Sequence, residues 1–218
     1  MSPQELILVR HGQSTANATG VWQGQLDYPL SDKGRAQARY AGSDLASRPF
    51  DVLYASPLSR AYETAEIIAR EAGFGGTVQP DEDLAERHGG LWEGTTREER
   101  EARYPDLVRK LADLPEEERW QVIGAETDEQ VLARFSSAVA RIRGLSSAGR
   151  RIVVVSHGGA MRAFLRHLFG PDILPRSQRT PNASITRLAW ETNGSDPRLL
   201  ELASTEHLPR DESLPGGQ

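Results

Sequence analysis

The chain has 218 residues, of which 38% are hydrophobic and 26% are charged, a composition typical of a globular protein rather than a disordered or membrane-embedded one. The net charge of −5 argues against a general nucleic-acid binder, which would carry a basic surface. The sequence contains no cysteine, which excludes disulfide frameworks, thiolate nucleophiles, zinc–thiolate sites and iron–sulfur clusters.

The beginning of the sequence, MSPQELILVRHG, lacks the basic segment and the long apolar run of a signal peptide or a membrane span. We therefore expect a cytoplasmic protein that does not associate with membranes. Arginine outnumbers lysine by 24 to 2, which supplies many planar groups that can bind anions.

Short apolar runs predict strands, and apolar residues at helical spacing predict helices. The predicted strands are 6–9, 51–55, 77–79, 152–155, 184–190 and 199–203. Four helices are predicted. The first spans 31–46 and is capped by Ser31, and the second is capped by Ser56, opened by Pro57 and ends near Gly73. The third spans 127–142 and begins with a capping box formed by Thr127 and Gln130, and the fourth spans 159–169. Strands that alternate with helices indicate an α/β fold, in which a mostly parallel sheet is covered on both faces as a three-layer α/β/α sandwich.

The segment 86–126 is rich in glycine and proline at irregular spacing, so we expect loops and short helices that extend over one end of the sheet. The last ten residues are polar and contain proline and glycine, which predicts a flexible tail over 209–218. We treat residues 1–208 as a single domain.

Two histidines directly follow predicted core strands: His11 follows the first and His157 follows the most β-branched one. Because ligands bind at the carboxyl ends of parallel strands, both side chains are expected to face one crevice. Arg60 lies in the first turn of the helix after another strand, where the helix N-terminus favours anions. Residue type and placement together predict a phosphate or carboxylate site.

At this point the sequence resembles the histidine phosphatase superfamily, which includes the cofactor-dependent phosphoglycerate mutases. The resemblance rests on ordered blocks that together cover residues 5 to about 170. The blocks are LVRHGQSTAN at 8–17, LSDKG at 30–34, SPLSRA at 56–61, Glu86 with GLWEG at 90–94, GAET at 124–127 and SHGG at 156–159. It implies a phosphoglycerate mutase-like fold and a single catalytic domain, in which 86–126 and 171–181 are the excursions on the substrate side.

The resemblance also implies the catalytic residues. His11 would be the nucleophile that forms a phosphohistidine, Arg10, Arg60 and His157 would bind the transferring phosphoryl group, and Glu86 would give a proton to the leaving oxygen. Positive charge from the two arginines disfavours the imidazolium, so the pKa of His11 is expected to lie below its usual ~6.5. The expected substrate-binding residues are Asn17, Gln23, Gly24 and Gly158.

The implied mechanism needs no cofactor and no metal, and the sequence has no His-x-x-x-His or comparable metal-ligand spacing. We therefore expect a metal-independent phosphatase whose partner is a small phosphorylated metabolite. Nothing in the sequence identifies the oligomeric state, and a dimer is possible.

The superfamily contains hydrolases and mutases. The sequence Glu86-Arg87-His88 matches the mutases, but Gly89 stands where they usually carry tyrosine and Arg97 where they carry lysine. The paired arginines that they use for the substrate carboxylate have no clear match between 100 and 126. We favour a phosphomonoester hydrolase. A cofactor-dependent phosphoglycerate mutase is the alternative, and a catalytically weak phosphate-ligand-binding protein is a further one.

The sequence does not identify the substrate beyond its phosphate. Arginines in the two excursions are candidates for binding a carboxylate or a second phosphate, although most are expected to be solvated. They are Arg97, Arg100, Arg103, Arg176 and Arg179. Trp22 and Trp92 are expected to be buried packing residues, and His88 is expected near the site.

Overall fold

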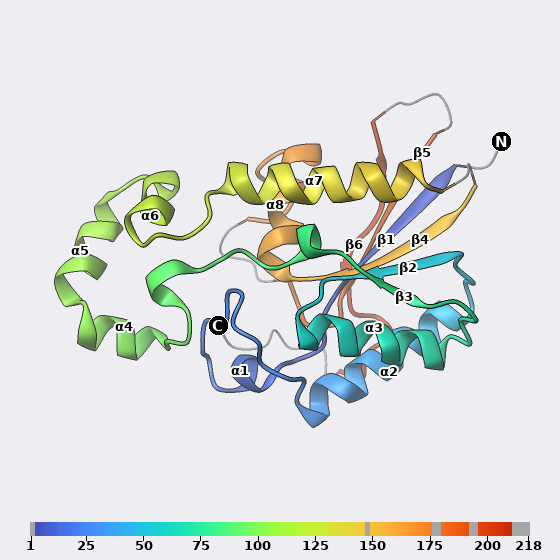
Figure 1. Ribbon diagram of the computed structural model, residues 1–218, viewed down its shortest axis with the longest axis horizontal. Coiled ribbons are helices and arrows are strands. Elements are labelled where there is room, and N and C mark those ends of the chain that lie inside the picture. The colour runs from blue at the N-terminus through green and yellow to red at the C-terminus, as the bar shows by residue number, and fades with distance from the viewer. Residues whose placement is uncertain (1–2, 147–148, 176–179, 192–195, 211–218) are drawn as a thin grey trace.

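The computed structural model of the chain describes residues 3–146, 149–175, 180–191 and 196–210. In these ranges six strands form one sheet in the order β3-β2-β4-β1-β5-β6 (Figure 1). The strands from β3 to β1 are parallel, whereas β5 runs antiparallel to β1, and β6 antiparallel to β5. The strands are β1 (Gln4–Arg10), β2 (Val52–Ala55), β3 (Val78–Pro80), β4 (Arg151–Ser156), β5 (Ile185–Trp190) and β6 (Arg198–Ser204).

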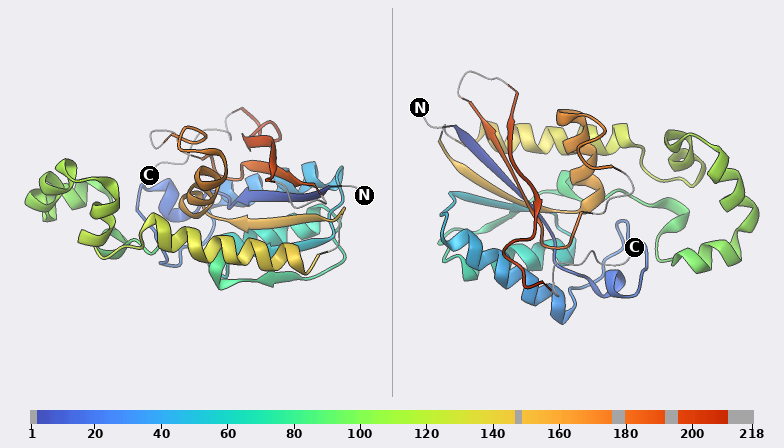
Figure 2. Two further views of the ribbon diagram at one scale, coloured as in Figure 1. Left: turned by 90° about the horizontal axis from the view of Figure 1, so that it is seen from above. Right: turned by 180° about the vertical axis from the view of Figure 1, so that it is seen from behind.

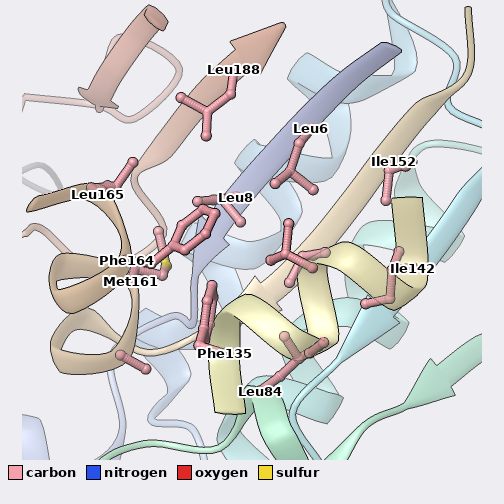
Figure 3. Close-up of a cluster of buried hydrophobic side chains, with 14 of the residues drawn as sticks. Leu6, Leu8, Leu84, Phe135, Ile142, Ile152, Met161, Phe164, Leu165 and Leu188 are labelled. Atoms are coloured by element: carbon pink, nitrogen blue, oxygen red, sulfur yellow. The ribbon is translucent and has the colours of Figure 1, made fainter. Parts of the chain in front are cut away.

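Helices cover both faces of the sheet because alternate strand residues point to opposite sides. Helices α2 (Asp32–Ala46) and α3 (Ser59–Glu71) pack with Ile7, Val9, Val153 and Val155 of the sheet. Helices α7 (Asp128–Gly144) and α8 (Gly158–Phe169) pack on the other face. Figure 3 shows the second cluster, where Leu6, Leu8 and Ile152 of the sheet lie among side chains of α7 and α8, such as Phe135 and Phe164. The arrangement confirms the predicted α/β fold with helices on both faces of a mostly parallel sheet.

The predicted helix starts are confirmed except at α3. Ser31 and Thr127 cap α2 and α7 through their side chains, as the sequence predicts. The prediction that Ser56 caps α3 and Pro57 opens it is wrong, because the helix begins at Ser59 and its N-cap residue, Leu58, has no side-chain cap. The hydroxyl of Ser56 is 2.8 Å from Nε2 of His157 and accepts a hydrogen bond from the backbone N–H of Leu58. The Ser56 side chain therefore contacts His157, the residue directly after β4, instead of capping α3.

The segment 86–126 forms the short helices and loops that the sequence predicts, gathered beyond one end of the sheet in every view (Figure 2). This lobe has its own apolar cluster, built around Trp92, Leu111, Ile123 and Ala125. Its helices are η2 (Gly90–Trp92), α4 (Arg97–Arg103), α5 (Pro105–Asp113) and α6 (Glu116–Val122). The remaining short elements are α1 (Thr15–Ala18) and η1 (Glu82–Leu84).

Parts of two predicted segments lie outside the described residues, namely 176–179 of the second excursion and 211–218 of the tail. Within the described ranges, no helix combines the length and the apolar character needed to cross a membrane.

Candidate active site

The candidate catalytic side chains converge at the carboxyl ends of neighbouring strands. Strands β1 and β4 pair in parallel with Arg10 opposite Ser156, so the residues that follow, His11 and His157, leave the sheet side by side. The centroids of the two imidazole rings are 5.0 Å apart. Arg60 comes from the first turn of α3, which follows β2, and is 1% exposed. The structure thus brings the predicted residues from three strand ends into one place.

His11 is held in the form that a nucleophile needs. Its Nδ1 is 2.7 Å from the carbonyl oxygen of Gly12, which can only accept a hydrogen bond, so Nδ1 carries the proton. Nε2 is left with its lone pair. Burial, followed by the positive charges of Arg60 and Arg10, lowers the pKa of His11 well below its usual value, although the bond to Gly12 acts in the opposite direction. The predicted direction of the shift is confirmed, and burial, which the sequence did not foresee, is its largest cause.

His157 is also neutral at physiological pH. Burial is the largest cause of its lowered pKa, and the charge of Arg60 is the next. The hydrogen bond between Nε2 and the Ser56 hydroxyl fixes the plane of the ring. Nδ1 is buried and has no hydrogen-bond partner among the described residues, so it is available to a ligand.

Backbone carbonyls orient the arginines of the site. Arg60 donates from Nη2 to the carbonyl of Gly24 at 2.7 Å and from Nη1 to that of Leu26 at 2.9 Å. Burial lowers the pKa of Arg60 to about 10, so it stays protonated at neutral pH. Arg10 donates to the carbonyl of Thr180. Carbonyl oxygens orient a guanidinium without cancelling its charge, which leaves the positive charge for an anion.

The glycines predicted to bind substrate have steric reasons to be glycine. Gly24 has a φ of +54°, and an added Cβ would lie 2.0 Å from Oε1 of Glu93. At Gly158 an added Cβ would come to 3.3 Å from Nε of Arg10. A side chain at position 24 would therefore displace Glu93, and one at position 158 would crowd Arg10.

Glu86 lies against the N-terminus of α8. Its Oε2 accepts a hydrogen bond from the backbone N–H of Gly159 at 3.0 Å. Its Oε1 accepts from Ala160 at 2.9 Å and from Arg87 at 2.8 Å. These backbone donors fix the carboxyl group beside the helix that His157 begins.

The predicted neutral donors are buried and partly unpartnered. Oδ1 of Asn17 accepts hydrogen bonds from the backbone of Ser14 and from Nδ2 of Asn182, each at 3.2 Å, which leaves its Nδ2 without a partner among the described residues. Oε1 of Gln23 is likewise buried and unpartnered there. The unpartnered atom of Asn17 is thus a donor that is available to a ligand, whereas that of Gln23 is an acceptor.

Sequence reasoning missed Asn182. Its Nδ2 donates to the carbonyl of His11 at 3.1 Å as well as to Asn17, so it ties the nucleophile's backbone to the amide beside it. Asn182 precedes β5, where a single asparagine after a proline gives no local signal of a site. The sequence analysis also passed over Arg162 on α8, which lies close enough to Glu86 for their charges to interact.

The arginines of the excursions do not converge on the catalytic residues as a group. Arg97 pairs with Glu101 on the exposed face of α4, and Arg103 is exposed. The guanidinium of Arg100 lies over the rings of Trp22 and Trp92, at 5.1 and 5.6 Å from their centroids. Arg176 and Arg179 lie outside the described residues.

Trp22 and Trp92 pack in the lobe, as expected, and Trp92 is 7% exposed. Together with Trp120 they line a pocket of about 360 Å³ among α4, α5 and α6. His88 is half exposed, with Nε2 at 3.8 Å from Glu93. Within the part of the chain that the structure describes, no group of three or more His, Cys, Asp or Glu side chains is placed to hold a metal ion.

Comparisons with known proteins agree with this geometry. A family model described as histidine phosphatase superfamily (branch 1) matches residues 6–203. The chain is 35% identical over 169 residues to phosphoserine phosphatase 1 of Hydrogenobacter thermophilus, with 78% of each chain covered. It is 34% identical over 207 residues to a glucosyl-3-phosphoglycerate phosphatase of Mycobacterium tuberculosis, with 90% of each covered.

Among solved structures, a mycobacterial glucosyl-3-phosphoglycerate phosphatase in complex with VO3 is similar at a TM-score of 0.73 and 30% identity, over 91% of this chain and 98% of that one. A relative named as a 2,3-bisphosphoglycerate-dependent phosphoglycerate mutase, from Azorhizobium caulinodans, matches at 31% identity over 88% of this chain and 96% of its own.

Proposed function

The chain belongs to the histidine phosphatase superfamily (branch 1), and from this premise we propose that it hydrolyses small phosphate monoesters through a phosphohistidine on His11. The observation that carries the proposal is the state of His11, a buried neutral imidazole with a free Nε2 that lies in the field of two arginines. Relatives named as phosphatases at 34–35% identity support hydrolysis as the reaction.

In the first step, Nε2 of His11 attacks phosphorus, the new P–N bond forms and the bond from phosphorus to the ester oxygen breaks. Glu86 in its protonated form gives its proton to the departing oxygen, so the product leaves as an alcohol. In the second step, water attacks the phosphohistidine while Glu86 takes a proton from that water. The P–N bond breaks, and inorganic phosphate and neutral His11 are regenerated.

Phosphoryl transfer depends mainly on position and on charge stabilisation, and the site is suited to both. Arg10 and Arg60 bind the non-bridging oxygens, and Nδ1 of His157 and Nδ2 of Asn17 are unpartnered nitrogens that can reach them. No cofactor takes part in either step.

One position favours hydrolysis over the mutase reaction. At Gly89, where the mutases usually carry tyrosine, an added Cβ would lie 3.0 Å from Cγ of Glu93 and 3.2 Å from Nε1 of Trp22. Any side chain at this position therefore requires Glu93 and Trp22 to shift slightly. The pocket wall and hydroxyl that the mutases place at this position are therefore absent in this chain.

The proposal includes one catalytic domain over 1–208, a small phosphorylated metabolite as substrate, and a cytoplasmic location. The cysteine-free composition is compatible with that location. Phosphoserine and phosphoglycerate derivatives, which the names of the phosphatase relatives mention, head the panel of candidate substrates.

A paired assay on the wild type and His11→Ala tests the function. It follows phosphate release from a panel of small phosphomonoesters, and 3-phosphoglycerate isomerisation with and without 2,3-bisphosphoglycerate. We expect phosphate release that vanishes in the variant. Isomerisation that requires the bisphosphate and outpaces phosphate release would establish a mutase instead. Ligand binding with turnover near the uncatalysed rate would establish a phosphate-binding protein.

A further inference from the structure

Arg162 is a partly buried cation. It lies in the second turn of α8, and its Nε is buried with no hydrogen-bond partner among the described residues. Within those residues the structure gives its guanidinium no hydrogen bond and no ion pair. Burial is the largest cause of the lowered pKa of Arg162, and the carboxylate of Glu86, the next cause, acts in the opposite direction. A buried donor without a partner costs stability, so Nε of Arg162 is a candidate for contact with a ligand.

Two arginines near the Glu86 segment differ from Arg162, because each is paired with a carboxylate. Arg87 donates to the carboxylate of Asp128 and to the carbonyl of Glu126. Arg134 forms a bidentate pair with the carboxylate of Glu126, at 2.9 and 2.8 Å. These two arginines connect the lobe and α7 to the segment that carries Glu86, and the carboxylates of Asp128 and Glu126 neutralise their charge. Arg162 has no such pair with a carboxylate among the described residues, although Glu86 lies near enough to act on its pKa.

Helix geometry places Arg162 beside the expected leaving group. Gly159, whose N–H binds Glu86, lies three residues before Arg162 and therefore on the same face of α8. Long side chains on a helix lean toward its N-terminus, which here means toward Glu86. Glu86 is the first of the charged groups that act on the pKa of Arg162, ahead of Arg166, Arg87 and Asp128. The guanidinium thus lies near the carboxyl group that protonates the departing oxygen.

We propose that Arg162 binds a carboxylate on the leaving alcohol, so that the preferred substrates are phosphate monoesters of hydroxy acids. The inference rests on the proposed function, in which Glu86 protonates the departing oxygen and therefore lies beside the leaving group. A planar guanidinium can donate two parallel hydrogen bonds to a carboxylate, and its single positive charge balances the single negative charge of that group. It also supplies what the excursion does not, since Arg97 is paired with Glu101 and Arg100 is stacked on tryptophans.

The test compares 3-phosphoglycerate with glycerol 3-phosphate, which differ mainly in having a carboxylate or a hydroxymethyl group at the same carbon. We measure kcat/KM for both compounds with the wild type, Arg162→Met, Arg162→Lys and the control Arg97→Met, which removes an exposed arginine from α4. The wild type is expected to prefer 3-phosphoglycerate. Arg162→Met is expected to lower kcat/KM for that compound about 10- to 100-fold, the range for loss of a charge-assisted hydrogen bond, and to change glycerol 3-phosphate less than about twofold.

For 3-phosphoglycerate, kcat/KM of Arg162→Lys is expected to lie between the values of the wild type and of Arg162→Met. The control Arg97→Met is expected to have the kcat/KM values of the wild type for both compounds. An equal loss on both compounds would overturn the inference, since it would mean that Arg162 only supports Glu86. A wild type without preference for 3-phosphoglycerate would overturn it as well.

Binding separates failure of this inference from failure of the proposed function. Calorimetric titration of His11→Ala with each compound needs no turnover. Tighter binding of 3-phosphoglycerate that disappears in His11→Ala/Arg162→Met supports the carboxylate site even if the wild type hydrolyses neither compound. Equal binding of the two compounds to His11→Ala overturns it, whatever the reaction proves to be.

Discussion

The buried histidine pair makes the stability of the fold sensitive to mild acid. His11 and His157 both have a pKa well below the usual value, chiefly because they are buried and because Arg60 lies near them. Above pH 7 both residues are neutral in the folded and in the unfolded chain, so they contribute no pH dependence. As the pH falls through ~6.5, the unfolded chain takes up protons and the folded one does not. The free energy of unfolding therefore falls with decreasing pH, and it continues to fall until the lowered pKa values of the folded state are reached.

The size of the effect follows from linkage. While the folded histidines stay neutral, each lowers the free energy of unfolding by about 1.4 kcal/mol per pH unit below the unfolded pKa. Between pH 7.5 and pH 5.5 one such histidine costs about 1.4 kcal/mol and the pair about 2.7 kcal/mol. That is a large fraction of the roughly 5–15 kcal/mol by which domains are usually stable.

Urea unfolding followed by tryptophan fluorescence measures this loss, with wild type compared to His11→Gln/His157→Gln. The variant carries neutral side chains in both states, so its pH dependence lacks the contribution of the pair. His207, whose pKa is also lowered by burial, is present in both proteins and cancels. The buffer must be free of phosphate, because a ligand that binds the folded state would mask the loss. If the free energy of unfolding fell equally with decreasing pH in both proteins, the claim that burial and Arg60 lower the pKa of His11 and His157 would be refuted.

The site makes further predictions. Asn182→Ala removes the hydrogen bonds to the His11 carbonyl and to Asn17, so kcat/KM for phosphate release is expected to fall about tenfold with the fold retained by circular dichroism. A value within twofold of the wild type would contradict that role. Gly159→Ala places a Cβ 2.6 Å from Oε1 of Glu86 and is expected to lower kcat at least about tenfold by moving the carboxyl group, whereas Gly144→Ala, whose Cβ meets nothing within 4 Å, serves as the matched control. Equal kcat values for these two variants would count against Glu86 as the proton donor. Exhaustive dialysis against EDTA is expected to leave phosphate release unchanged, and recovery of lost activity by one added metal would disprove metal independence.

Features that depend on local pattern could be predicted from the sequence. The apolar runs of β1 and β4 and the capping box at Thr127 determine their own elements. The rule that ligands bind at the carboxyl ends of parallel strands then predicts that His11 and His157 face one crevice, and the structure adds that β1 and β4 are neighbours. The direction of the His11 pKa shift could also be predicted, since Arg10 is adjacent in sequence and Arg60 follows the next strand along the chain.

What the sequence could not predict depends on partners far along the chain. Ser56 has the form of a helix cap, but its hydroxyl contacts a ring 101 residues away. Asn182 reaches Asn17 across 165 residues, and no pattern around a lone asparagine announces that contact. Arg162 was visible as a helical residue. That Arg87 and Arg134 pair with carboxylates from other segments while Arg162 does not, among the described residues, depends on contacts that no local pattern shows.

The 24 arginines of this chain differ in the kind of partner that they have. Arg87 and Arg134 pair with carboxylates, which cancels their charge and makes them ties between segments. Arg60 donates to backbone carbonyls instead, and no carboxylate pairs with it in the described ranges. Such a site keeps its net positive charge and its geometry before any ligand arrives, so little reorganisation is needed when negative charge develops on the phosphoryl oxygens. The cost is the burial of charge, which lowers the pKa of Arg60. Burial also lowers the pKa of Arg162, the arginine for which we propose a carboxylate on the leaving alcohol as the ligand.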